Sequence, residues 1–212
     1  MVQALTWRRR VVLPVFVVAL LAGCGGAAVR DVYFSLRPEP AMVPSGPPIP
    51  GTLRISPLAA RGFVGGSRIV YRTADEPLEV QRYNELLWEE VPARAIADEL
   101  LAAMRAAQAF DSVVTAGDPA RATYLLSGEV TRFEHRPTDQ PPGVSAEFTL
   151  ALVAARSREL LVSKTYAGFE PTGNAAGEPV TPQAMAAAFN RLTGRLVGEV
   201  VGDVQRLAPQ LR

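Results

Sequence analysis

The chain has 212 residues, a length that suits one domain with a full hydrophobic core, or one domain plus a tail. Lys and Arg (22) nearly balance Asp and Glu (21), so the net charge of +1 implies neither nucleic acid nor an acidic surface as a partner. With one cysteine and one histidine, the chain cannot form an internal disulfide, and a zinc site would have to be built almost wholly from carboxylates.

The N-terminus is predicted to be an export signal. Three arginines at 8–10 precede an apolar run of 11 residues at 11–21, which is shorter than the roughly 20 residues of a membrane span. Leu21-Ala22-Gly23-Cys24 also resembles a bacterial lipobox, in which cleavage leaves the cysteine as a lipid-modified N-terminus. We predict a lipoprotein signal peptide at 1–23 and acylation, for example by palmitate, at Cys24. The alternative is an ordinary buried cysteine in a retained anchor helix.

Residues 24–50 are predicted to connect the lipidated residue to the folded domain at 51–208. They would comprise a short tether, a first strand at 32–36 and a proline-rich linker. Six prolines lie between Arg37 and Pro50, which excludes a helix or a central strand in that stretch.

Short strands are predicted at 52–58, 69–72, 78–81 and 110–114. The turn Asp75-Glu76-Pro77 would join the second and third of these as a hairpin. Residues 86–92 are expected to lead into an amphipathic helix of about 16 residues that begins at Pro92. Ile96, Leu100 and Met104 would form its buried stripe.

Three longer segments alternate apolar and polar side chains, which predicts strands with one face in the core. They lie at 122–133, 145–154 and 159–168. A proline-rich loop at 137–143 and the tight turn Arg156-Ser157-Arg158 would join them as consecutive antiparallel strands.

The strongest periodic signal is a C-terminal helix of about 27 residues, predicted to start with Thr181 as its N-cap. Gly194, Gly198 and Gly202 recur every four residues, which predicts close packing on the sheet or, alternatively, a partner helix. The order of elements predicts an α+β fold, a mainly antiparallel sheet with two amphipathic helices packed on one face.

The chain offers no catalytic constellation, so no enzymatic activity is expected. His135 is the sole candidate base, no G-x-S-x-G elbow accompanies it, and we interpret it as a solvated histidine at a strand end. Glu129 and Glu134 are five residues apart on one strand and should face opposite sides, which argues against a paired-carboxylate site. No metal or cofactor is expected.

Several segments together carry a family resemblance that covers nearly the whole mature chain. They are the lipobox, Val32–Leu36, Leu53–Leu58, Arg68–Arg72, Tyr83–Pro92, Tyr124–Glu134 and the final helix. With them the chain resembles the ABC-type transport auxiliary lipoproteins, the PqiC- or YmbA-like group. The resemblance would make 51–208 an ABC-transport auxiliary domain.

This resemblance implies a periplasm-facing lipoprotein that works with an ABC permease/ATPase complex and an MCE-type substrate-binding protein. Such systems move lipids or other hydrophobic molecules across the cell envelope, and this chain would be a docking subunit without catalysis. Glycine rather than aspartate at position 25 favours the outer membrane by the sorting rule of enteric bacteria. The alternative is a general envelope-assembly or scaffolding lipoprotein that binds another protein.

Exposed aromatic and arginine side chains are the usual anchors of protein interfaces. Phe63 in its glycine-bearing loop, Tyr71, Arg72 and Trp88 are therefore the candidate partner-binding residues. Each could instead belong to the core, and for Trp88 the alternative is a hydrophobic plug at the start of the first helix.

Overall fold

The computed structural model of the protein describes residues 30–39, 46–173 and 179–211. The chain divides into two compact units, Met1–Arg30 and Asp31–Arg212, and the second unit is described below. The predicted signal peptide and Cys24 lie outside the described residues. Within the part that is described, no helix has both the length and the apolar character that a membrane span requires.

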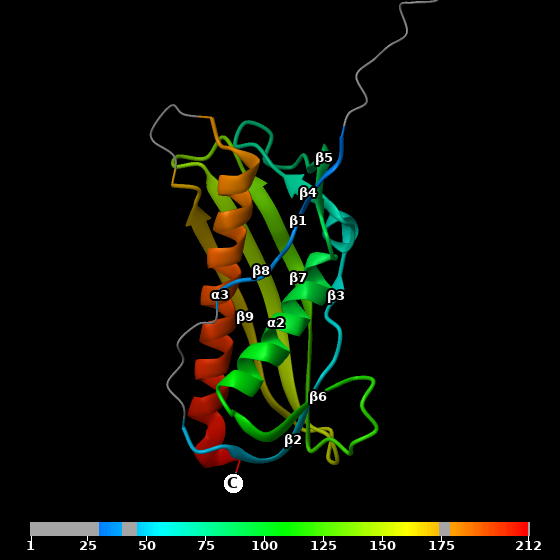
Figure 1. Cartoon of the computed structure of the whole chain (residues 1–212). Coiled ribbons are helices and arrows are strands. Elements are labelled where there is room, and N and C mark those ends of the chain that lie inside the picture. The colour runs from blue at the N-terminus through cyan, green and yellow to red at the C-terminus, as the bar shows by residue number, and fades with distance from the viewer. Residues whose placement is uncertain (1–29, 40–45, 174–178, 212) are drawn as a thin grey trace, which may run out of the picture. The chain divides into compact units, whose positions relative to one another are not determined.

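The folded unit is a curled nine-stranded sheet with two helices (Figure 1). Its strands are β1 Val32–Phe34, β2 Ile49–Ile55, β3 Ala59–Ala60, β4 Arg68–Tyr71, β5 Gln81–Trp88, β6 Phe110–Thr115, β7 Tyr124–Arg136, β8 Gly143–Ala154 and β9 Leu160–Pro171. The helices are α2 Pro92–Ala106 and α3 Pro182–Leu207, and the short 3-10 turns are η1 Gly62–Gly65 and η2 Ala208–Gln210.

Strand β7 lies in the middle of the sheet and has partner strands along both edges. One of its edges pairs with β8, which in turn pairs with β9, and both pairings are antiparallel as predicted. The other edge pairs in turn with β2, β3 and β4, which all run parallel to β7. Strand β6 extends the sheet from β2, and β5 and β1 extend it from β4.

The prediction of a mainly antiparallel sheet is only partly right, because the sheet is mixed. Among the described residues, β1–β5, β2–β6 and the three pairings at the second edge of β7 are parallel. Alternation along a strand shows which face is buried, but it carries no information about the direction of the neighbouring strand. The α+β class itself is confirmed.

Strand β5 replaces two predicted elements. Residues 78–81 were expected to form the hairpin partner of the strand at 69–72, and 86–92 a lead into the helix. Instead the antiparallel partner of β4 is one strand from Gln81 to Trp88. The strand was not predicted because it is largely polar and lacks an alternating apolar pattern. Only its last two residues, Leu87 and Trp88, are buried, and Leu78 before it is exposed.

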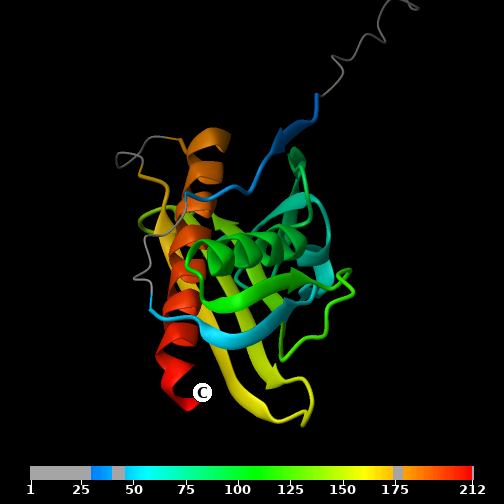
Figure 2. The same ribbon diagram turned by 60° about the horizontal axis from the view of Figure 1, so that its bottom comes forward.

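The two helices cover one face of the sheet, as predicted, and Figure 2 shows α2 and α3 crossing on that face. Pro92 and Pro182 begin them, each at a position where a missing N–H leaves no hydrogen bond unmade. Thr181 is the N-cap of α3, since its side chain accepts a hydrogen bond from the backbone N–H of Ala184. Beneath the helices, the ring of Phe189 stacks on Phe133 with centroids 4.5 Å apart.

The prediction that the α3 glycines pack on the sheet is wrong for Gly194. A Cβ added there would lie 3.2 Å from the carbonyl oxygen of Glu39 and from the Cβ of Pro38. The chain after β1 therefore crosses α3 at this glycine. Asn190, one turn earlier, anchors the crossing: its Oδ1 accepts from the Arg37 N–H at 2.6 Å and its Nδ2 donates to the Ser35 carbonyl at 3.2 Å.

Candidate functional site

Phe63 lies in η1 and is 44% exposed. The guanidinium of Arg82, from β5, lies 4.3 Å from the centroid of its ring, which is a cation–π contact. An accessible aromatic ring is the kind of anchor that protein interfaces use. Phe63 therefore remains a candidate for partner binding.

Tyr71 belongs to a cluster on the face of β4 and β5 that lies opposite the side chain of Arg82. Its ring lies 4.5 Å from that of Tyr83, and its hydroxyl donates to Oε1 of Gln81. The hydroxyl of Tyr83 makes a 2.7 Å hydrogen bond with Nδ1 of His135 on β7. Tyr71 is half-buried, so a partner would reach only part of its ring.

Arg72 follows β4 and binds a buried carboxylate. Its Nε lies 3.3 Å from both carboxylate oxygens of Glu134, whose side chain is 6% exposed. Its Nη1 donates to the Pro77 carbonyl at 2.5 Å. The sequence placed Tyr71 and Arg72 next to each other, but strand alternation directs them to opposite faces of the sheet.

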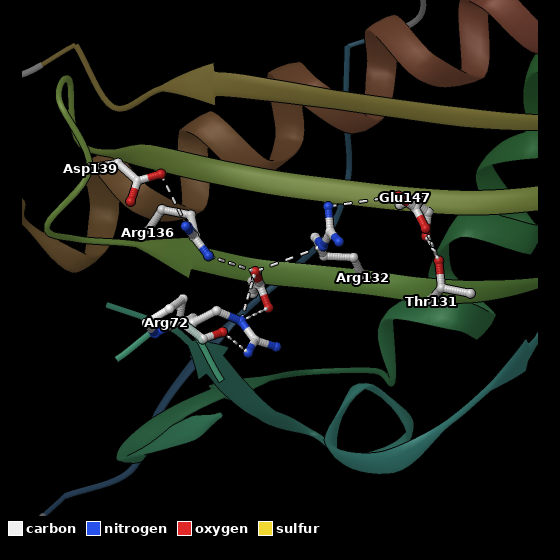
Figure 3. A network of polar contacts seen from close by, with 8 residues as sticks. Arg72, Thr131, Arg132, Arg136, Asp139 and Glu147 are labelled. Carbon is white, nitrogen blue, oxygen red and sulfur yellow. Dashed lines mark hydrogen bonds and ion pairs between the residues drawn. The ribbon is translucent and has the colours of Figure 1, made fainter. Parts of the chain in front are cut away.

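Two further arginines on β7 complete the surroundings of Glu134. Arg136 lies 3.3 Å and Arg132 lies 3.9 Å from its Oε1. Arg136 also pairs with Asp139 at 3.1 Å, and Arg132 with Glu147 of β8 at 3.7 Å (Figure 3). Three guanidiniums thus meet three carboxylates, which joins β4, β7 and β8 on the face opposite the helices.

This network is a structural element with little capacity for chemistry. The buried carboxylate of Glu134 accepts hydrogen bonds from Arg72 and Arg136, so it is not placed to exchange a proton with a substrate. Residues two apart on a strand share a face. The spacing of Arg132, Glu134 and Arg136 in the sequence could therefore have indicated this network.

A β-bulge overturns the expectation for Glu129 and Glu134. The register of β7 against β8 shifts between Val130 and Arg132, so both Val130 and Phe133 face the core although they are three residues apart. The two glutamates therefore share the outer face. Each has its own cation, Arg61 at 2.5 Å for Glu129 and Arg72 for Glu134, so they do not form a paired acid and base.

Trp88 is not part of an accessible surface. It is 2% exposed, and its ring lies 5.5 Å from Phe133 and 5.1 Å from Phe189. The candidate role in partner binding is therefore wrong for Trp88, because no partner can reach a side chain that the two helices and the sheet enclose. The alternative interpretation, a hydrophobic plug where the chain enters the first helix, describes its position.

A comparison with known protein families matches residues 34–201 to the ABC-type transport auxiliary lipoprotein component. The chain belongs to this family. The resemblance inferred from the sequence is confirmed, and the ABC-type transport auxiliary lipoproteins are not a known enzyme family.

Solved structures share the fold of this auxiliary lipoprotein. A DUF330 family protein from Xanthomonas campestris is 21% identical, with a TM-score of 0.74 over 85% of this chain and 98% of that one. An uncharacterised protein of known structure is 15% identical, with a TM-score of 0.55 over 86% of this chain and 99% of that one. A search of curated protein sequences gives no match.

In this auxiliary lipoprotein His135 is buried, contrary to the expectation of a solvated side chain. It is 3% exposed, and burial lowers its pKa to about 4. Burial also raises the pKa of its partner Tyr83 to about 12, with a smaller contribution from Tyr71. Tyr83 of β5 lies against the ring of His135, and this strand was not predicted from the sequence.

The buried histidine predicts a loss of stability in acid. The pKa of His135 is about 6.5 in an unfolded chain and about 4 in the folded protein. Below pH 6.5 protons bind the unfolded state preferentially, so stability falls from there down to about pH 4 and the loss then levels off. The full loss is about 3 kcal/mol. His135→Gln, which can still bond Tyr83, should remove this part of the pH dependence in urea unfolding between pH 7 and 4. Parallel pH profiles for the two proteins would contradict the assignment.

Neither Phe63 nor Arg72 lies beside a metal site. Within 30–39, 46–173 and 179–211, no group of three or more His, Cys, Asp or Glu side chains is arranged to hold a metal ion. The accessible candidates that remain in this auxiliary lipoprotein are Phe63 with Arg82, and the exposed parts of Tyr71 and Arg72.

Proposed function

We propose that this auxiliary lipoprotein is a lipid-anchored, periplasm-facing docking subunit of an ABC transport system, without catalysis of its own. The system would include a permease/ATPase complex and an MCE-type substrate-binding protein, and would move lipids or other hydrophobic molecules across the envelope. The observation that carries the proposal is the family match over residues 34–201.

The site geometry supports a binding role. Nδ1 of His135 is engaged by Tyr83, and the ring is enclosed, so it is not placed to act as a base on a substrate. The buried carboxylate of Glu134 is held by arginines. By contrast, Phe63 offers an exposed aromatic surface to a partner, as a docking subunit requires.

The anchor in this proposal is acylated Cys24. Gly25 supports an outer-membrane location facing the periplasm, because the retention signal of enteric bacteria is an aspartate at that position. A subunit held in this way could connect a transporter to the membrane without spanning it.

Co-purification from detergent-solubilised membranes tests the proposal. The tagged full-length protein is expected to recover the MCE-type protein and the permease and ATPase subunits. Phe63→Ser should reduce that recovery at least fivefold, since an exposed anchor residue typically contributes 1–2 kcal/mol or more to binding. Leu160→Ser is the matched control, because Leu160 is also an exposed apolar residue, on β9, away from η1.

The outcomes separate the alternatives. Recovery of other envelope proteins, without any transporter subunit, would contradict the transport role and favour the scaffolding alternative. Undiminished recovery with Phe63→Ser would show that the transporter docks elsewhere on the domain.

A further inference from the structure

Four arginines line an open concavity of about 830 Å³ at the end of the sheet where β7 begins. Arg54 comes from β2, Arg121 from the loop between β6 and β7, and Arg156 and Arg158 from the turn between β8 and β9. None of the lining residues is an aspartate or a glutamate. We call this feature the arginine concavity.

The sheet topology brings these distant segments together. Thr123, at the start of β7, donates its N–H to the Thr52 carbonyl on β2 at 2.8 Å, and its own carbonyl accepts from the Ala155 N–H at 2.8 Å. The β6–β7 loop and the β8–β9 turn therefore lie side by side at the lower end of the sheet in Figure 1. The concavity is a product of the fold and is not visible as a run of basic residues in the sequence.

Most arginines elsewhere in the described part of the chain have acidic partners, for example Arg61 with Glu129 and Arg191 with Glu170. In the same described residues, Arg121, Arg156 and Arg158 are exposed and their side chains make no ion pair or hydrogen bond. Three unneutralised cations around one concavity repel one another, and a bound anion would relieve that repulsion.

Arg54 is held in place at the floor of the concavity. Its Nη2 donates to the carbonyl oxygens of Asp118, at 3.3 Å, and Ala120, and its Nε is buried without a partner among the described residues. The Asp118 carboxylate is engaged by Thr115, from which it accepts bonds to the backbone N–H at 2.7 Å and the hydroxyl at 2.9 Å. A guanidinium fixed by backbone carbonyls needs little reorganisation to bind an anion.

We propose that the arginine concavity docks an acidic, carboxylate-bearing segment of a partner protein. Guanidiniums bind carboxylates through two parallel N–H···O bonds, and several of them in one concavity would engage successive acidic side chains. The volume exceeds that of a single small anion and is in the range of sites that enclose a larger ligand. This inference adds a location to the proposed docking function and rests on it.

We take a protein as the occupant, because the concavity lies away from the point where the folded unit begins. Strand β1, where the folded unit begins, pairs with Leu86–Trp88 of β5. Strand β5 pairs with β4, and β4 pairs with Glu134 and His135 near the far end of β7. Leu125 beside the concavity and His135 are ten residues apart, which is about 34 Å along a strand. The start of the folded unit therefore lies toward the opposite end of the sheet from the arginines, as the blue strand β1 shows in the upper part of Figure 1.

Fluorescence anisotropy with a labelled octaglutamate peptide tests the site on the purified full-length protein in non-ionic detergent. The variant Arg121→Ser/Arg156→Ser/Arg158→Ser should bind at least tenfold more weakly than the unaltered protein. The control Arg61→Ser/Arg94→Ser/Arg206→Ser removes the same charge from three exposed arginines elsewhere and should change the affinity less than threefold. All six are surface positions, where substitutions are expected to leave the fold intact.

Three results would overturn the proposal: no peptide binding by the unaltered protein, equal weakening in both triple variants, or arginine-dependent binding to vesicles containing phosphatidylglycerol without peptide binding. The last would identify a membrane contact instead. If the unaltered protein does not bind the peptide but still recovers transporter subunits from membranes, only the proposal of this site is refuted. Peptide binding without any recovered transporter subunit refutes the proposed function while leaving an acid-binding site.

Discussion

Replacing Cys24 by serine is expected to transfer the protein almost completely from the membrane fraction to the soluble fraction and to abolish its function in transport. Two or more acyl chains give stable membrane association, and the described residues contain no helix that could substitute for them. The folded unit begins at Asp31, so its thermal unfolding temperature should be unchanged. Membrane flotation, with transport measured in the native envelope, checks both expectations.

Two controls make this result interpretable. Gly26→Ser alters the same tether and keeps the cysteine, so it should remain with the membrane. The intact mass of Cys24→Ser shows whether the signal peptide has been removed, since an uncleaved apolar segment would itself associate with lipid. Full transport activity from a processed, soluble Cys24→Ser protein would contradict the docking role.

Replacing Trp88 by alanine is expected to lower the free energy of unfolding by about 3–5 kcal/mol. The indole is enclosed between Phe133 of the sheet and Phe189 of α3, so its removal leaves a cavity that neither layer can close without moving. Domains of this size have a stability of about 5–15 kcal/mol, so the variant should unfold at a much lower urea concentration.

The size of the effect should follow burial. Trp88→Phe keeps a ring in the cavity and should cost less than the alanine variant. Leu78→Ala removes an apolar side chain that is 95% exposed and should change stability by less than about 0.5 kcal/mol. A cost below 1 kcal/mol for Trp88→Ala would show that this residue is not a core residue in solution.

Elements whose signals are local in the chain could be predicted before the structure was known. Helix α3 was predictable because its apolar spacing and its Thr181-Pro182 start act within a few residues of the chain. Strands β7, β8 and β9 were predictable in order and pairing because the strands alternate and their connections are short. The family could be recognised from the same segments.

Features that depend on residues distant in sequence became apparent only in the three-dimensional structure. The parallel pairing of β2 and β4 with β7, the burial of His135 and Trp88, and the bulge that turns Glu129 and Glu134 to one face follow from which strands meet. The arginine concavity has the same origin, since Arg54 comes from β2, Arg121 from the β6–β7 loop and Arg156 from the β8–β9 turn. Local periodicity shows which face of a helix or strand is apolar. It contains no information on which segment will cover that face, because that choice is made by packing across the whole sheet.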